Sequence, residues 1–195
     1  MKPNRKLLAI STVALVTALT LGLAPVAHAG LINNGGGLIY DTDLNITWYD
    51  GLTGTYPHAP WVSVGGLTVG GTAAGSWRHP TTPGTTGPSA WNFAHEGEMG
   101  HLYYDELGNS EDGPLTNMGP FTNLQSDDYY WTSTMYYSSN AWVFSFANGR
   151  QGIDYVEYYN HVLPVHDGNV PEPATMGLLG LGLAGLIARR RKQRV

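Results

Sequence analysis

The basic residues of this chain are confined almost entirely to its two ends. Eight of the ten Lys and Arg lie before residue 7 or after residue 188, so residues 30–170 keep only Arg78 and Arg150. The same stretch holds fourteen of the fifteen carboxylates, which gives it a net charge of −12 with histidine neutral. Such a surface repels phosphate backbones and sulfated polysaccharides. We therefore expect no nucleic-acid partner.

The middle stretch also carries the residues that can build a folded core. All six Trp and all twelve Tyr lie in it, a loading that disordered acidic chains lack. About 140 residues are enough for one domain with its own core. Its many glycines favour turns over long helices. Cysteine is absent, which excludes disulfides, thiolate metal sites and cysteine nucleophiles.

The N-terminus has the layout of a secretory signal. Three basic residues precede an apolar run over residues 7–23, and Ala27 and Ala29 then form a small-x-small site for a cut before Gly30. Residues 1–29 are therefore predicted to be a signal peptide, helical in its apolar part, that exports the remainder of the chain across the inner membrane.

The C-terminus combines three features. Val170, Pro171, Glu172 and Pro173 precede an apolar run over residues 174–188, and a cluster of Arg and Lys follows. The run is somewhat shorter than the roughly 20 residues that usually span a bilayer. The basic cluster is expected to stay in the cytoplasm. The physics thus predicts a C-terminal transmembrane helix that anchors an external domain.

This C-terminal arrangement resembles the PEP-CTERM sorting signal of Gram-negative bacteria. The resemblance implies an exosortase-type processing enzyme as partner, a cut near Pro-Glu-Pro, and a role alongside exopolysaccharide production. Whether the anchor is cleaved or retained is left open. The predicted division is a signal peptide over 1–29, an exported domain over 30–169 and a sorting signal over 170–195.

The middle stretch predicts mainly antiparallel strands and one helix. Apolar residues at offsets 3, 4 and 8 place Met99, Leu102, Tyr103 and Leu107 on one helical face, from a start near Phe93 to a stop at residues 108–109. Asn-Gly at 148–149 predicts a hairpin. The expected strands are 38–40, 46–49, 129–134, 141–146, 153–158 and, at a sheet edge because of its proline, 161–165.

Five motifs in order resemble the C-terminal domain family of the Legionella collagen-like adhesin, a domain of unknown function. The resemblance implies an α+β fold: a single antiparallel-sheet-rich domain with one main helix, C-type-lectin-like, that works in adhesion or glycan contact. The polyanion binding of the founding adhesin needs basic residues that this stretch lacks. The motifs are residues 43–48, 77–81, 130–134, 141–146 and 162–168.

The sequence offers weak candidates for a metal site. His95 and His101 are six residues apart, which does not match the i, i+4 spacing of a zincin. Glu98 and His101 can share a helical face and bind a metal if other ligands join them. Calcium is an alternative for scattered carboxylates, although a solvated acidic face is the simpler interpretation. These candidates are Asp105, Glu111, Asp112, Asp127 and Asp128.

Arg78 follows Trp77, and two interpretations are open. The pair can bind a ligand through a cation beside an aromatic ring. Alternatively, Arg78 pairs with an internal carboxylate and ties its loop to the sheet, which we favour in so acidic a stretch. Sugar stacking is a further hypothesis for exposed rings near strand ends, against ordinary core packing. The rings concerned are Tyr136, Tyr137, Tyr158 and Tyr159.

The expected function is that of a non-enzymatic protein of the cell surface or exopolysaccharide matrix. The sequence contains no nucleophile motif or phosphate-binding loop, and we predict no catalytic residue and no cofactor. The expected ligands are neutral glycans or exopolysaccharide. Two alternatives remain: a secreted hydrolase or metal-dependent enzyme acting on the matrix, and a calcium-stabilised structural module.

Overall fold

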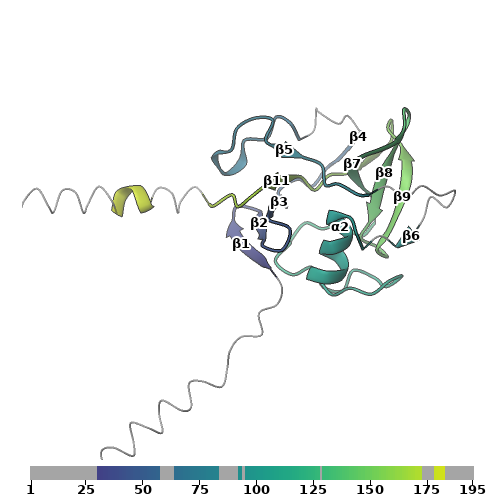
Figure 1. Cartoon of the computed structure of the whole chain (residues 1–195), viewed down its shortest axis with the longest axis horizontal. Coiled ribbons are helices and arrows are strands. Elements are labelled where there is room, and N and C mark those ends of the chain that lie inside the picture. The colour runs from purple at the N-terminus through teal and green to yellow at the C-terminus, as the bar shows by residue number, and fades with distance from the viewer. Residues whose placement is uncertain are drawn as a thin grey trace, which may run out of the picture.

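The computed structural model shows two sheets with a short helical segment against them (Figure 1). The predicted signal peptide over 1–29 and most of the predicted span over 174–188 lie outside the residues that the structure describes. The described residues are 30–57, 64–83, 92–93, 95–127, 129–172 and 178–182.

The first sheet is antiparallel throughout and joins the two ends of the domain. The predicted strands 38–40 and 46–49 are confirmed, and they form a hairpin in which Leu38 pairs with Tyr49 and Asp41 with Ile46. The last strand then pairs with both neighbours in the middle of the sheet. The strand order is β1 (Leu31–Gly35), β2 (Leu38–Asp41), β3 (Ile46–Tyr49), β11 (Val165–Asp167) and β5 (Trp77–Arg78).

The second sheet is mixed, since β10 runs parallel to β7 and its other pairs are antiparallel. The Asn-Gly hairpin is confirmed: Gly149 adopts φ 75° and its N–H donates to Ser145 O at 2.9 Å. The order is β4 (Thr55–Pro57), β10 (Tyr159–His161), β7 (Tyr129–Tyr137), β8 (Asn140–Ser145), β9 (Arg150–Tyr155) and β6 (Asn92–Phe93).

The helical segment consists of α2 (Glu98–His101) and a π-helical turn, η2 (Leu102–Glu106). The predicted apolar face is confirmed, since Met99, Leu102, Tyr103 and Leu107 are all buried. The predicted start near Phe93 is wrong, because that residue lies in β6. Gly97 and Gly100 have low helix propensity, so the helix begins later and is shorter than predicted.

The main core lies between the helical segment and both sheets. It contains Trp48 and Val165 from the first sheet, Leu102 from the helical segment, and Tyr130 and Phe144 from the second sheet. A second cluster packs Val64 against Trp131 and Val143. A short 3₁₀ turn, η1 (Val69–Gly71), lies beside a third cluster made by Leu38, Trp77 and Val170. The domain is thus held together by residues far apart in the sequence.

The prediction of one edge strand over 161–165 is wrong. Residues 162–164 connect β10 in one sheet to β11 in the other, and β11 lies between β3 and β5. Pro164 falls in this connection, where its missing N–H breaks no ladder, and its carbonyl accepts from Tyr49 N at 2.9 Å. The sheet-rich character with one short helix is confirmed, whereas the C-type-lectin-like fold stays a prediction.

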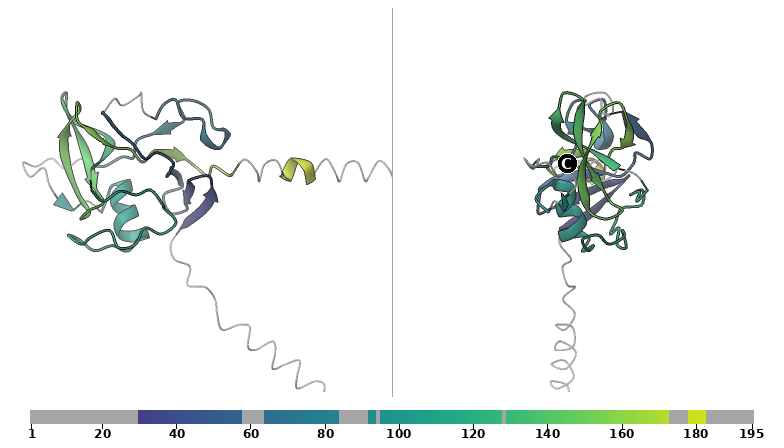
Figure 2. Two further views of the ribbon diagram at one scale, coloured as in Figure 1. Left: turned by 180° about the vertical axis from the view of Figure 1, so that it is seen from behind. Right: turned by 90° about the vertical axis from the view of Figure 1, so that its right-hand side faces the viewer.

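The described domain begins and ends on the same side. The end of β1 lies beside the segment by which the chain leaves after β11, and the sheet formed by β7, β8 and β9 lies at the opposite end of the molecule (Figure 2). Asn34 Nδ2 donates to Asn169 Oδ1 at 2.7 Å, which ties these two segments together. The far end of the second sheet therefore points away from both chain ends.

Candidate functional site

Four exposed tyrosines lie at or next to strand ends of the second sheet, at the ends of β7 and β9 and at the start of β10. Tyr137 is 67% exposed, Tyr155 55%, Tyr158 56% and Tyr159 64%. The sheet register places Tyr137 and Tyr155 on either side of Asn140, and Tyr158 and Tyr159 follow Tyr155 in the connection to β10. The rings of Tyr155 and Tyr158 are 5.6 Å apart between centroids. We call these four residues the tyrosine face.

An open cleft of about 480 Å³ adjoins the tyrosine face. Asp154 and Glu157 supply carboxylates at its wall, and Asn160 Nδ2 donates to Asp154 Oδ2 at 3.0 Å. Among the described residues, neither Arg nor Lys lines it. The cleft therefore offers rings and hydrogen-bond acceptors without positive charge. Its lining residues are Tyr129, Asp154, Glu157, Tyr158, Tyr159 and Asn160.

Of the other two ring candidates, neither lies on an open surface. Tyr136 is half-buried and packs edge-on against Trp142 at 5.7 Å. Trp77 is buried and contacts the rings of Tyr49 and His166. Tyr137 is therefore the residue of the predicted ligand-binding set that the structure leaves widely exposed.

Arg78 is used inside the fold. Its Nη2 and Nη1 donate to the two carboxylate oxygens of Glu98 at 2.7 and 2.8 Å, and Nη2 also donates to Asp167 Oδ1 at 2.8 Å. Thr81 N donates to the same Glu98 at 2.6 Å. The hydrogen bonds to Glu98 raise the pKa of Arg78 further above its ordinary value, against the opposing effect of burial. Arg78 thus has the internal carboxylate partners that the structural interpretation predicts.

Among the described residues, the carboxylates proposed as calcium ligands do not come together in one group. Each described one contacts a different basic side chain, so they are spread around the domain. Asp128 lies outside the described residues. The pairs are Asp105 with His101 at 3.0 Å, Glu111 with His95 at 3.0 Å, Asp112 with Arg150 at 3.2 Å and Asp127 with His161 at 3.8 Å.

A different group of possible metal ligands does come together. Asp41, His101 and Glu106 place one ligand atom each within 4.8 Å of one another. Glu98, the other weak candidate ligand beside His101, is instead bound by Arg78. In the sequence, His101 and Glu106 are five residues apart. An α-helix would place such residues about 140° apart, so a search at helical spacing misses this pair.

Burial and charge set the protonation of Glu106. Desolvation raises the pKa of its carboxyl above 4.5, Asp41 and Asp43 raise it further, and His101 opposes them. Glu106 thus carries an electrostatic cost when it is ionised without a cation.

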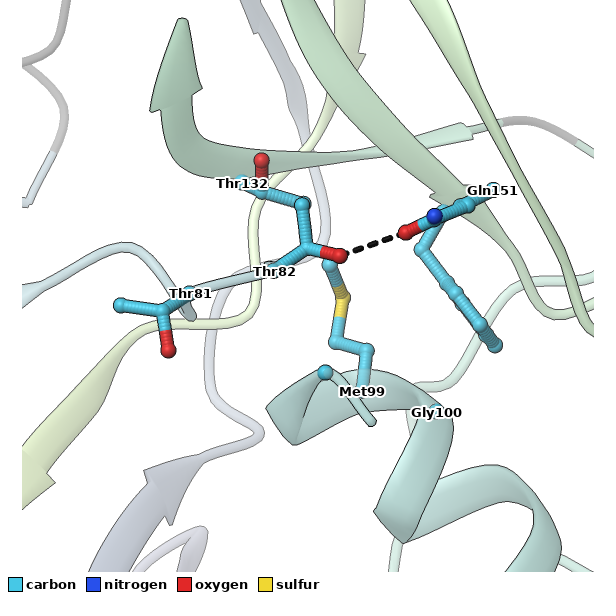
Figure 3. A pocket seen from close by; sticks show the side chains of 8 residues that line it. Thr81, Thr82, Met99, Gly100, Thr132 and Gln151 are labelled. Carbon is cyan, nitrogen blue, oxygen red and sulfur yellow. Dashed lines mark hydrogen bonds between the residues drawn. The ribbon is translucent and has the colours of Figure 1, made fainter. Parts of the chain in front are cut away.

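A small enclosed gap near the start of α2 is part of the core. Thr81, Thr82, Met99, Thr132 and Gln151 surround it (Figure 3), and Thr82 Oγ1 donates to Gln151 Oε1 at 2.5 Å. The gap has no room for a water molecule. It is therefore a packing defect without room for a ligand.

The predicted sorting signal starts inside the fold. Val170 is 3% exposed, its N–H donates to Thr47 Oγ1 at 3.0 Å, and its carbonyl accepts from Asn34 Nδ2 at 2.9 Å. Glu172 packs its carboxylate over Gly35, which adopts φ 84°. Pro173 lies outside the described residues. The Pro-Glu-Pro segment thus begins at the surface of the first sheet.

Residues 169–192 match the model of the PEP-CTERM protein-sorting motif. The chain carries a PEP-CTERM motif. This motif indicates an exported protein that an exosortase-type enzyme sorts, with a C-terminal signal that anchors it in the membrane before processing. No curated protein and no solved structure matches the chain. The resemblance of the middle to the collagen-like adhesin family therefore stays a prediction.

Within the PEP-CTERM motif, the structure describes residues 169–172 and 178–182. Residues 178–182 are helical and exposed. Over the described part of the chain, the structure contains no helix of the length and apolar character needed to cross a membrane. The predicted span over 174–188 lies mostly outside that part.

Proposed function

We propose that this exosortase-sorted protein is a non-enzymatic component of the cell surface or exopolysaccharide matrix, and that its tyrosine face contacts neutral carbohydrate. The observation that carries the proposal is the exposure of four tyrosines beside an open cleft lined by carboxylates. Exposed aromatic side chains that lie together on a surface often mark an interaction site.

The chemistry of the cleft suits a sugar. Tyrosine presents a flat apolar ring and a hydroxyl, so it can stack on the C–H face of a pyranose and still hydrogen-bond. Asp154 and Glu157 can accept hydrogen bonds from sugar hydroxyls. These contacts are individually weak, so adhesion depends on many copies along a surface.

The negative charge of the cleft and of the domain disfavours an anionic sugar as the direct ligand. In the described part of the chain, the cleft is lined by two carboxylates and by neither Arg nor Lys, and residues 30–170 are strongly acidic. A sulfated polymer would approach against this field. The proposed ligand is therefore a neutral glycan, or an acidic one bridged by calcium.

The position of the cleft fits a surface role. The sheet formed by β7, β8 and β9 lies at the end opposite to the point where the chain leaves after β11 and the sorting motif begins (Figure 2). A protein held or processed at its C-terminus would present the tyrosine face outward.

Binding to immobilised neutral polysaccharides tests the proposal with the purified full chain. Tyr158→Ala should weaken retention on the order of tenfold, which corresponds to about 1.4 kcal/mol. Tyr158→Phe keeps the ring and should retain most of the binding. Ile32→Ser, which removes a 50% exposed apolar side chain from β1, is the matched control. Equal binding by Tyr158→Ala and the unchanged protein would contradict the proposal.

The same samples test the hydrolase alternative and the charge of the ligand. Shorter oligosaccharides released over time would indicate a hydrolase. Binding that is lost with chelator and returns with calcium would identify the calcium-bridged form. Firm retention on heparin at low salt with chelator present would show recognition of polyanions, against the neutral-glycan proposal.

A further inference from the structure

A buried polar group lies where the helical segment meets the turn after β2. Asp41 ends β2, His101 ends α2, and Glu106 ends the π-helical turn. In η2 the chain makes i→i+5 hydrogen bonds, of which Leu107 N to Leu102 O at 2.9 Å is one. Residues five apart are neighbours in such a turn, which brings Glu106 beside His101. Isolated π-helical turns occur frequently at functional sites.

The buried carboxylate of Glu106 has only one close charged or polar neighbour of opposite character among the described residues, His101 Nε2 at 3.4 Å. The Glu106 side chain is fully buried, and neither carboxylate oxygen has a hydrogen-bond partner among the described residues. Asp41 and Asp43 add negative charge nearby. A buried ionised group without a partner is strongly unfavourable. This environment calls for a cation.

His101 is oriented toward Glu106 by a second carboxylate. Its Nδ1 lies 3.0 Å from Asp105 Oδ2, which leaves Nε2 facing Glu106 Oε1 at 3.4 Å. Nε2 is also buried without a hydrogen-bond partner in the described structure. Two ligands at about 2.1 Å from a tetrahedral ion lie about 3.4 Å apart. Metal-binding histidines are commonly held by a carboxylate on their other nitrogen in this way.

Asp41 is held in place before any ligand arrives. Its Oδ1 accepts from the N–H groups of Asp43 at 3.1 Å and Leu44 at 2.9 Å, and its Oδ2 lies 3.3 Å from Trp48 Nε1. A carboxylate has about four lone-pair positions, so it can accept these bonds and still bind a cation. The three groups are thus fixed by separate elements around one point.

We propose that Asp41, His101 and Glu106 bind one divalent transition-metal ion, with Zn²⁺ the best fit. One imidazole nitrogen with two carboxylates suits Zn²⁺ and its neighbours in the first transition row, whereas Ca²⁺ and Mg²⁺ prefer oxygen alone. The side chain of His101 is 23% exposed, which gives an ion a route inward. The ion would join β2 to the helical segment. This proposal is independent of the one on carbohydrate.

Metal analysis of the full chain, purified without chelator, is the first test. We expect close to one equivalent of zinc per chain. Removal by chelator should lower the unfolding temperature by on the order of 5 °C. Zn²⁺ should restore it, and Ca²⁺ should not. Co²⁺ in place of zinc should give visible absorption bands that report a nitrogen- and oxygen-bound ion.

Variants locate the ion. Glu106→Gln and His101→Gln should each remove the bound zinc and the temperature shift. The matched control is Glu111→Gln, which changes an exposed carboxylate that contacts His95. It should leave both unchanged. Zinc that persists at one equivalent in both ligand variants would place the ion elsewhere and overturn the proposal.

A chain cut before Gly30 would offer a rival cation to the same carboxylate. A methyl group built on Gly30 would lie 3.1 Å from Glu106 Oε1, so the α-ammonium of a chain cut before Gly30 would lie close to it. Acetylation of that amine separates the two. If the protein holds no metal, does not respond to Zn²⁺ and loses stability on acetylation, the ammonium is the partner and the metal proposal is wrong.

Discussion

Two glutamates at opposite ends of one helical segment have opposite environments. Glu98, at the start of α2, receives two hydrogen bonds from Arg78 and one from the Thr81 N–H. Glu106, at the end of η2, is more deeply buried and receives none from the described residues. The carboxylate of Glu98 is fully engaged by contacts within the domain, whereas that of Glu106 is available to a ligand. Burial of a carboxylate therefore does not by itself identify a ligand site. The number of hydrogen bonds that the carboxylate receives distinguishes the two cases.

The largest expected effect comes from removing the partner of Glu98. Arg78→Met should lower the free energy of unfolding by about 3 kcal/mol, because Glu98 and Asp167 lose their cation. Urea denaturation of the full chain measures it. A loss below about 1 kcal/mol would mean that water replaces Arg78 at Glu98 and would weaken the contrast between the two glutamates.

The same substitution at the two glutamates should act in opposite directions. Glu98→Gln should destabilise the chain by about 2 kcal/mol, since Arg78 loses a charged acceptor. Glu106→Gln should stabilise the metal-free chain by about 1 kcal/mol, since a buried charge beside Asp41 and Asp43 disappears. Parallel denaturation curves in chelator provide the comparison, and a shared sign would refute it.

A smaller effect is expected on the pH dependence of the metal-free chain. Burial, together with Asp41 and Asp43, raises the pKa of Glu106 above 4.5, and the neighbouring His101 and Asp105 also face this group. The native state then holds a proton that the unfolded state has released. Stability should therefore fall as pH rises from about 4.5 through the raised pKa. Glu106→Gln should flatten this slope, and an unchanged slope would assign it to another group.

The smallest effect belongs to the other arginine of the domain. Arg150 is 3.2 Å from Asp112, whose side chain is 64% exposed, and its guanidinium lies 4.6 Å from the centre of the Phe93 ring. Exposed pairs contribute little, so Arg150→Ala should cost about 0.5 kcal/mol. It serves as the control for Arg78→Met under identical conditions, and equal losses would show that burial does not separate the two pairs.

Local patterns in the sequence predicted the elements that depend on neighbours in the chain. The apolar spacing from Met99 to Leu107 found the helical face, and Asn-Gly at 148–149 found its hairpin. The excess of acid also predicted an internal partner for Arg78. Such features follow from residues a few positions apart, where propensity and periodicity act directly.

The candidate metal site depends on contacts that no local pattern contains. Asp41 and His101 are sixty positions apart and meet only because the helical segment packs on the first sheet. Glu106 joins them through a π-helical turn, whereas sequence patterns assume α-helical spacing. The tyrosine face likewise needs the sheet register, which brings Tyr155 beside the β7–β8 turn.

The burial of Val170 sets a limit on the length of the finished protein. Because this residue fills the cluster with Leu38 and Trp77, a cut on its N-terminal side would remove part of the core, and a cut beyond it would leave the core whole. Pro171 and Glu172 add at most about 7 Å of extended chain. A processing enzyme that cuts at Pro-Glu-Pro would therefore have to bind its substrate segment directly beside the surface of a folded domain. The folded domain thus sets the shortest C-terminus that leaves the core intact.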